Sequence, residues 1–373
     1  MTDGGRRPAE RALPGLRALR RGEPAAGAAV LALWAGLLAL AGLRGGRIAG
    51  TVVGGGAGEW LALVTLVGAL TWCWTRGTRA RPLTGGDGPG TGLLEEATAT
   101  HSGRRGLVLV ALVVLAALLA PYLAPHDPAR QIDVLAGAQL PPGAGHPLGT
   151  DRVGRDVLSR VLYGARVTLA AAVPAVLVST TLGAAVGGAA GYLGGAVDSV
   201  SMRGVDLLLA FPRIVILVAA AALFEPSLGL VILLLGLTGW MDVARLVRGE
   251  VLSIRERPYV RAAENLDLGR VRVLVRHVLP NAAGPLLVAA TLGVADAALA
   301  EATLSFLGLG VQPPTPSLGG MVAGGRDALI GAWWVVVFPG AVLTATVLGF
   351  NLLGEAARAE AAGDGSARRE GTP

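Results

Sequence analysis

The sequence predicts an all-α polytopic membrane protein. The chain of 373 residues is 53% hydrophobic and only 16% charged, and its mean hydropathy is +0.59. A soluble domain carries about 25% charged residues. The apolar residues are also gathered in long runs, as a helix needs in order to cross the hydrocarbon core of a bilayer. A helix satisfies its own backbone polar groups in lipid, so these runs favour spanning helices.

We expect about eight spans, of which the first two form an extra N-terminal membrane hairpin within residues 1–75. They lie at about 25–43 and 59–75, and Trp60, Trp72 and Trp74 are placed near the ends of the second like an aromatic belt. No small-residue cleavage site follows the first run, so we interpret it as a retained anchor rather than a secretory signal. Residues 76–105 are rich in Gly, Thr and Pro, which predicts a flexible linker.

The other six spans are expected within residues 106–355, and residues 356–373 form a polar tail that we expect to be disordered. The six spans are predicted at about 106–122, 167–190, 205–224, 228–247, 282–306 and 332–353. Dense small residues at 183–195 favour close helix packing.

The distribution of arginine predicts the orientation in the membrane. Every basic residue is Arg, and clusters fall at 1–24, 76–105, 245–276 and after 354. Eight spans place all four clusters on one side, which is then the cytoplasmic side together with both termini. The loop at 123–166 conflicts with this rule, since it carries five Arg and lies outside in this arrangement.

Composition also excludes several kinds of site. A Walker A loop requires Lys, and the chain has none, so we expect no ATP hydrolysis by this chain and no enzymatic activity. A single cysteine, Cys73, excludes a disulfide framework. The basic pI near 10.5 reflects Arg residues beside spans, so we expect no nucleic-acid partner. The four His residues are dispersed at 101, 126, 146 and 277, and we expect no metal site.

The polar segment Tyr259–Asn281 lies between two apolar runs and is the strongest indication of function. Charged side chains are costly inside lipid, so the segment belongs to a loop outside the membrane, at about 250–281. Pro258 favours a helix start there, and Gly269 favours a left-handed C-cap. A second helix at 271–278 would end before Pro280. We interpret the first helix as a docking element for a soluble partner; the alternative is an interfacial helix without one. Its small apolar face would consist of Ala262, Ala263 and Leu266.

Three further blocks occur in a characteristic order: His146–Leu169, Gly191–Pro212, and Leu304–Asp327 followed by Trp333–Glu355. Together they resemble the dipeptide/oligopeptide/nickel family of ABC-importer permeases, specifically its C-type transmembrane subunit. The resemblance extends from about 106 to 358. It implies a six-span permease core in a bacterial cell membrane, paired with a second homologous permease. It further implies two cytosolic ATPase subunits that bind ATP and Mg, an extracytoplasmic solute-binding protein, and no cofactor in this chain. The solute would be a peptide or a related small solute, with nickel possible.

The resemblance implies that 250–281 is the coupling loop on which the ATPases dock. The family pattern is Glu-Ala-Ala, three residues, Gly, and later an apolar residue, any residue, Leu and Pro. Arg261 replaces the Glu, and Asp267 replaces the Gly. Glu264, one turn after Arg261, would pair with it or supply the missing acid. The predicted coupling residues are Tyr259, Arg261, Ala262, Ala263, Glu264, Leu266, Asp267, Gly269, Leu279 and Pro280.

Two other groups of residues are candidate sites. A turn followed by a helix start, with Asp156 at the helix end, would shape the external entrance or contact the binding protein; a purely structural elbow is the alternative. Its members are Gly149, Asp151, Gly154, Arg155 and Asp156.

Two carboxylates, Asp296 and Glu301, lie within the seventh predicted span. Charged residues inside a membrane usually serve function. The resemblance implies that they line the pore or form hydrogen bonds between subunits. The rival hypothesis, a proton-coupled secondary transporter, would use them as a proton relay.

Overall fold

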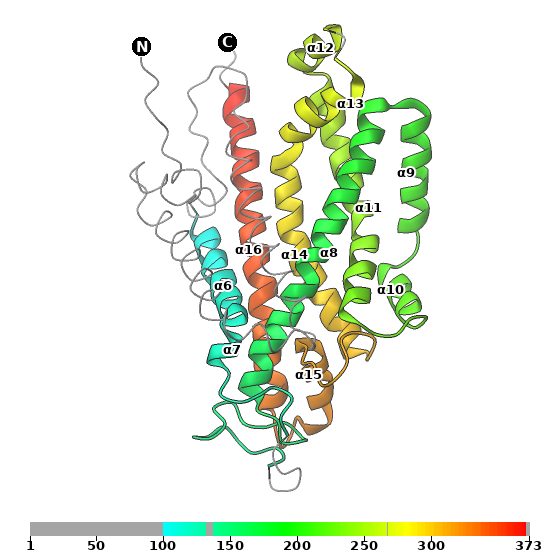
Figure 1. Cartoon of the computed structure of the whole chain (residues 1–373). Helices are drawn as coiled ribbons and strands as arrows, with labels where there is room; N and C mark the ends of the chain where they lie inside the picture. The colour runs from blue at the N-terminus through cyan, green and yellow to red at the C-terminus, as the bar shows by residue number, and fades with distance from the viewer. Residues whose placement is uncertain (1–99, 132–136, 267, 371–373) are drawn as a thin grey trace, which may run out of the picture. The chain divides into compact units, whose positions relative to one another are not determined.

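The computed structural model describes residues 100–131, 137–266 and 268–370, with side chains described as far as residue 359. The predicted hairpin at 1–75, its two spans, and the linker as far as residue 99 lie outside the described residues. Within the described part the chain is built of helices, with one isolated β-bridge between Thr150 and Asp156 (Figure 1).

Helices α6 to α11 occupy the first half of the described chain. α6 (His101–Leu118) and α7 (Ala120–Leu123) precede a long loop. α8 (Val157–Leu193), α9 (Gly195–Leu209), α10 (Arg213–Ala221) and α11 (Leu228–Arg255) follow.

The second half begins with the short helices α12 (Pro258–Asn265) and α13 (Arg270–Val273). A π-helical turn (Leu274–Val278) and a 3-10 turn (Leu279–Ala282) join α13 to α14 (Ala283–Phe306). α15 (Leu318–Gly325), a 3-10 turn (Arg326–Ala328) and α16 (Trp334–Glu370) complete the chain.

The helices confirm an all-α polytopic membrane protein. Five stretches are long and apolar enough to cross a membrane: α6, α8, α11, Arg270–Phe306 and Trp334–Ala359. α9 and α10 form a sixth candidate if this bent pair counts as one span. These six stretches correspond to the six spans expected within 106–355.

Three predicted boundaries were wrong. The span expected at 205–224 is broken, since α9 and α10 meet at 78°. Pro212 explains the break, because proline disfavours helical backbone at the residue before it. α8 begins ten residues before the predicted 167, because the Asp156 side chain caps it. α6 begins at His101, inside the predicted linker, because the Thr100 hydroxyl accepts a hydrogen bond from the Gly103 amide at 3.1 Å.

The predicted disordered tail also differs from the structure. α16 continues to Glu370, so most of 356–373 is helical. The sequence there is rich in Ala, Glu and Arg, which are strong helix formers, and this propensity outweighs the lack of apolar residues.

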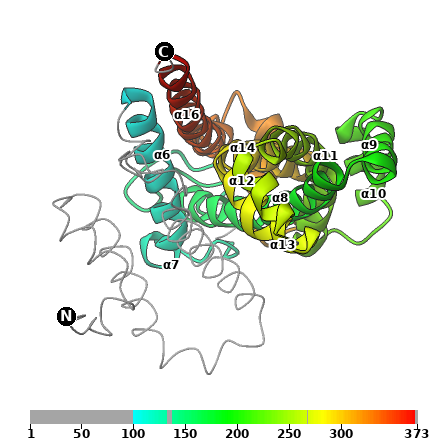
Figure 2. The ribbon, with the colours of Figure 1, turned by 90° about the horizontal axis from the view of Figure 1, so that it is seen from above.

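Viewed along the bundle, α8, α11 and α14 form the centre, with α6 and α16 along one side and α9 and α10 at the opposite edge (Figure 2). The contact between α8 and α11 is the most extensive. Gly183, Gly187 and Gly191 of α8 face α11 at four-residue spacing. A Cβ atom on Gly187 would lie 2.2 Å from the Ala244 carbonyl oxygen, so only glycine permits this approach.

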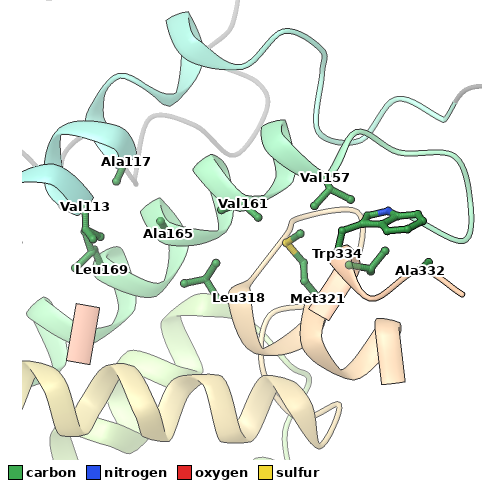
Figure 3. Packing of buried hydrophobic residues seen from close by; sticks show 11 residues of the cluster. Val113, Ala117, Val157, Val161, Ala165, Leu169, Leu318, Met321, Ala332 and Trp334 are labelled. Carbon is green, nitrogen blue, oxygen red and sulfur yellow. The ribbon is translucent and has the colours of Figure 1, made fainter. Parts of the chain in front are cut away.

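A hydrophobic core packs around the N-terminal part of α8 (Figure 3). Val157, Val161 and Leu169 of α8 pack against Leu318 of α15 and Trp334 of α16. The Trp334 indole nitrogen also donates a hydrogen bond to the Thr150 carbonyl at 3.1 Å. The loop before α8 is thereby tied to the start of α16.

We expect Gly187→Ala to destabilise the protein by about 1–3 kcal/mol, because the added methyl group collides with the α11 backbone. The thermal unfolding midpoint of the purified full-length chain in detergent measures the effect. Gly249→Ala is the matched control, since nothing lies within 4 Å of a Cβ atom at this position of α11. Equal midpoints for the two variants would contradict the role assigned to Gly187.

Candidate functional site

The predicted docking helix is α12, which lies with α13 at one end of the bundle (Figure 1). Pro258 occupies the first turn of α12, as predicted. Val260 and Ala263, three residues apart, share the face that turns inward. They pack in one cluster with Tyr192 at the end of α8, Val251 of α11 and Val278 before α14. α12 is therefore anchored to three helices that continue into the bundle.

The outward face of α12 differs from the predicted one. Ala263 belongs to the buried cluster and is unavailable to a partner. Ala262 and Leu266, four residues apart, share the exposed face, and Leu266 is 74% exposed. Val271 and Val275, just beyond, are also exposed. Ala262, Leu266, Val271 and Val275 are thus exposed apolar side chains at this end of the bundle, interspersed in the sequence with exposed charged residues.

The polar residues of α12 have other partners than the sequence predicted. Glu264 does not pair with Arg261: its carboxylate accepts a hydrogen bond from the Tyr192 hydroxyl at 2.8 Å. Arg261 forms its ion pair with Glu256, the residue that ends α11. Hydrogen bonds from Arg261 and from Arg255 hold the pKa of Glu256 below its ordinary value. Glu256 therefore stays ionised, and paired, across the neutral range.

The connection after α12 was also predicted incorrectly. Gly269 has φ −51° and ψ 137° and precedes α13, so it is not a left-handed C-cap; Leu266 ends α12 instead. Asp267 lies outside the described residues. The second helix does not stop before Pro280. The chain passes through the π-helical and 3-10 turns into α14, with Pro280 in the first turn of the 3-10 segment. Such turns accommodate the hydrogen bond that proline cannot donate.

The predicted residues of the loop fall into two groups. Ala263 and Glu264 tie α12 to the bundle, whereas Arg261, Ala262 and Leu266 lie on its exposed surface. Tyr259 and Leu279 pack around the buried cluster, and Pro280 is exposed. Beneath α12 a polar cleft of about 650 Å³ is lined by Tyr192, Arg255, Glu256, Arg261, Glu264 and Arg270.

A second cavity, of about 250 Å³, lies within the bundle between α8, α11 and α14. Asp296 lines it and forms an ion pair with Arg213 of α10, whose Nε also donates to the Thr238 hydroxyl at 3.3 Å. The other lining residues are largely small or apolar, among them Ala175, Val176, Leu235 and Ala289. Asp242 is a second carboxylate of the lining, and the Asp296 side chain is 62% exposed, so the charged pair is accessible to a polar solute.

Glu301 does not line this cavity. Its side chain is fully buried, and its two carboxylate oxygens accept hydrogen bonds from Thr168 at 2.8 Å and from Ser305 at 2.7 Å. Thr168 belongs to α8, so Glu301 joins α14 to α8. Sequence reasoning paired Asp296 with Glu301 because both lie in one span, but five residues on a helix place them on different faces.

The elbow before α8 is rigid and internally bonded. Asp156 caps α8, as predicted, accepting from the Ser159 amide at 2.8 Å. Asp151 accepts from the Arg155 amide at 2.9 Å and from the Arg155 Nε at 2.8 Å. Gly149 (φ +76°) and Gly154 (φ +75°) supply the left-handed backbone of the turns. These contacts give all five residues a place in one compact turn.

The elbow also contains a cluster of side chains that was not predicted from the sequence. His126 and His146, twenty residues apart and dispersed in polar segments, both face Asp156, and one ligand-type atom from each of the three lies within 4.8 Å of the others. No spacing motif signals the cluster, because three separate segments of the loop bring the side chains together.

Comparisons with known proteins cover most of the described chain. Residues 180–359 match the family described as binding-protein-dependent transport system inner membrane component. Residues 104–142 match the N-terminal transmembrane domain of oligopeptide transport permease C. The dipeptide transport system permease protein DppC of Bacillus subtilis is 40% identical over 251 residues, which cover 67% of this chain and 78% of that protein.

The chain belongs to the permease family of binding-protein-dependent ABC importers. The oligopeptide transport permease OppC of Bacillus subtilis (36% identical; 68% of this chain and 82% of that protein) and DppC of Haemophilus influenzae (38%; 68% and 87%) are further relatives of this permease. The longer match, 180–359, contains α12 and the α11 and α14 walls of the cavity.

We expect Tyr192→Phe to loosen α12 in this permease. A hydrogen bond to a charged group contributes about 1.5–3 kcal/mol, so its loss predicts amide exchange in 258–266 that is faster by at least about tenfold. Hydrogen-exchange mass spectrometry of the full-length chain measures this rate. Tyr122→Phe is the control, because Tyr122 is half-exposed on α7. Unchanged exchange in Tyr192→Phe would show that Glu264 does not anchor α12.

Proposed function

We propose that this permease translocates peptides inward across the bacterial inner membrane, as one half of a permease pair driven by two cytosolic ATPases. ATP and Mg would be bound by those partners, and an extracytoplasmic binding protein would deliver the solute. The single observation that carries the proposal is α12, a short helix that is anchored by its inner face and exposes the apolar side chains of Ala262 and, at its C-cap, Leu266.

The arrangement of α12 suits it to transmit a movement of a docked ATPase to the bundle. The exposed apolar residues Ala262, Leu266, Val271 and Val275, on and just after α12, would sit in a groove on an ATPase. This end of the bundle would then lie in the cytoplasm, and we propose the same side for both termini. The Arg-rich sequence around α12 supports that orientation. An apolar patch exposed at the aqueous end of a bundle marks an interaction site.

The anchoring supports a mechanism of alternating access. The cluster around Val260 and Ala263 joins α12 to α8, α11 and the start of α14. The same three helices wall the cavity that holds Asp296. When the ATPases close on ATP, movement of α12 would shift these helices as rigid bodies and change access to the cavity.

We propose peptides rather than nickel as the solute. The relatives described above are named for dipeptide or oligopeptide transport. The Arg213–Asp296 pair supports this choice, because a peptide carries one charged group of each sign at its ends and each could exchange partners with the pair. The second permease would complete the chamber.

The rival hypothesis of a proton-coupled transporter has weaker support. A relay requires its carboxylates to share a path, yet Asp296 lies in the cavity and Glu301 is enclosed between α8 and α14. Uptake that survives ATP depletion but collapses with a protonophore would favour that rival.

Leu266→Glu tests the docking surface. We expect the ATPase subunits to co-purify at less than about a tenth of the wild-type level, because a charge would be buried against an apolar groove. Leu307→Glu is the matched control: Leu307 is also exposed but follows α14 at the opposite end of the bundle. Normal co-purification of Leu266→Glu would remove this surface from the proposal.

Arg261→Glu tests the charge at the position where the family has Glu. The variant places two carboxylates together at 256 and 261, so we expect ATPase activity of the assembled complex to fall several-fold. Combining it with Glu256→Arg restores an internal ion pair. Recovery in the double variant would assign Arg261 to its bond with Glu256; continued loss would assign it to direct contact with the ATPase.

A further inference from the structure

We infer that His126, His146 and Asp156 form a binding site for a divalent transition metal at the elbow before α8. The three ligand-type atoms lie within 4.8 Å of one another. Asp156 Oδ1 lies 2.9 Å from His146 Nδ1 and 3.8 Å from His126 Nδ1. These separations bracket the roughly 3.3 Å between ligand atoms about 2.0 Å from a tetrahedral metal.

One ligand atom at this elbow has no other role. His126 Nδ1 is buried and has no hydrogen-bond partner among the described residues. A buried polar atom without a partner costs free energy, so its persistence requires an explanation. A metal held jointly with Asp156 and His146 would satisfy it.

The second layer of contacts holds the ligands in place. Asp156 Oδ2 accepts from the Ser159 hydroxyl at 2.7 Å, which leaves Oδ1 for the histidines. The same hydroxyl accepts from the His126 backbone amide at 3.1 Å. On the other side, the His146 backbone exchanges two hydrogen bonds with Gly143. Ligands oriented by such outer contacts are characteristic of metal sites.

The chemistry of the ligands selects the metal. Two imidazole nitrogens and one carboxylate suit Zn²⁺, Ni²⁺ or Co²⁺ rather than Ca²⁺ or Mg²⁺, which prefer oxygen. Three protein ligands leave at least one coordination position for water.

The location of the proposed metal site indicates that the metal would stabilise the fold of the elbow. Asp156 is about 28 Å along α8 from Ala175 in the cavity wall, at a rise of 1.5 Å per residue. The site is thus remote from the proposed solute chamber. A metal would join the segment after α7, the elbow turn and the first turn of α8. These segments are otherwise connected by loop backbone, hydrogen bonds, the Arg160–Asp151 ion pair and the contact between the two histidine rings.

Metal binding to the full-length chain tests the inference. The protein is purified with a tag that lacks histidine, stripped with EDTA, and dialysed against Zn²⁺, and bound metal is counted by mass spectrometry. We expect one Zn²⁺ per chain, with affinity weakened in His126→Gln and His146→Gln by more than the roughly 10–100-fold cost of losing an outer contact. His101→Gln is the control, since His101 is exposed on α6.

His126→Gln is the decisive variant, because His126 Nδ1 makes no hydrogen bond and its loss should leave the fold unchanged. Its unfolding midpoint without Zn²⁺ should equal that of the wild type, whereas only the wild type should gain stability when Zn²⁺ is added. Absence of stoichiometric binding to the wild type, or equal binding to His126→Gln, would overturn the site. Both readouts are independent of transport.

Discussion

The close contact between α8 and α11 positions every functional element of the described chain. Gly183, Gly187 and Gly191 let the two backbones approach to a distance that any side chain would prevent. Lipid offers no hydrophobic gain for helix association, so packing of small residues is the main source of cohesion. α8 is 37 residues long, so its N-terminal part projects beyond this contact, whereas Tyr192 at its other end directly follows Gly191. One end holds α12 through Tyr192, and the other begins at the Asp156 elbow.

This arrangement separates anchoring from recognition within α12. The inner face is held by apolar burial and by the Tyr192–Glu264 hydrogen bond. The outer face carries little that the fold itself requires, apart from the Arg261–Glu256 pair, which is exposed and contributes little to stability. Arg261, at the family's Glu position, therefore has an internal partner, and the change of charge needs no compensation in the core.

The intramembrane charges divide in the same way between function and structure. Glu301 is enclosed, and its oxygens are bonded to Thr168 and Ser305, so it joins helices. Asp296 borders a cavity and faces Arg213. Two carboxylates five positions apart thus have different partners, because the helix turns them toward different surroundings. Of these two carboxylates, only Asp296 borders the cavity, so only Asp296 can contact a solute there.

The sequence by itself determined the class and the family, and it indicated the loop at 250–281 that we propose as the coupling loop. Long apolar runs, the Arg distribution and the blocks around His146 and Tyr259 are local signals, and each depends on the physics of lipid or of a short motif. Helix caps at Thr100 and Asp156 extended α6 and α8 beyond the apolar runs, which hydropathy cannot reveal. Local propensity also predicted a cap at Gly269 and a helix end before Pro280. Both predictions were wrong, because packing between α11 and α14 allows the chain to continue.

Only the tertiary structure decided which side chains meet. Glu264 bonds to Tyr192, 72 residues away, and Thr168 to Glu301, 133 residues away. His126 and His146 join Asp156 because the folded loop brings three segments to one point. Contacts between distant segments depend on how helices pack and not on any spacing along the chain. For that reason only the fold revealed the partners of the predicted residues: Tyr192 for Glu264, Arg213 for Asp296, and the two histidines for Asp156.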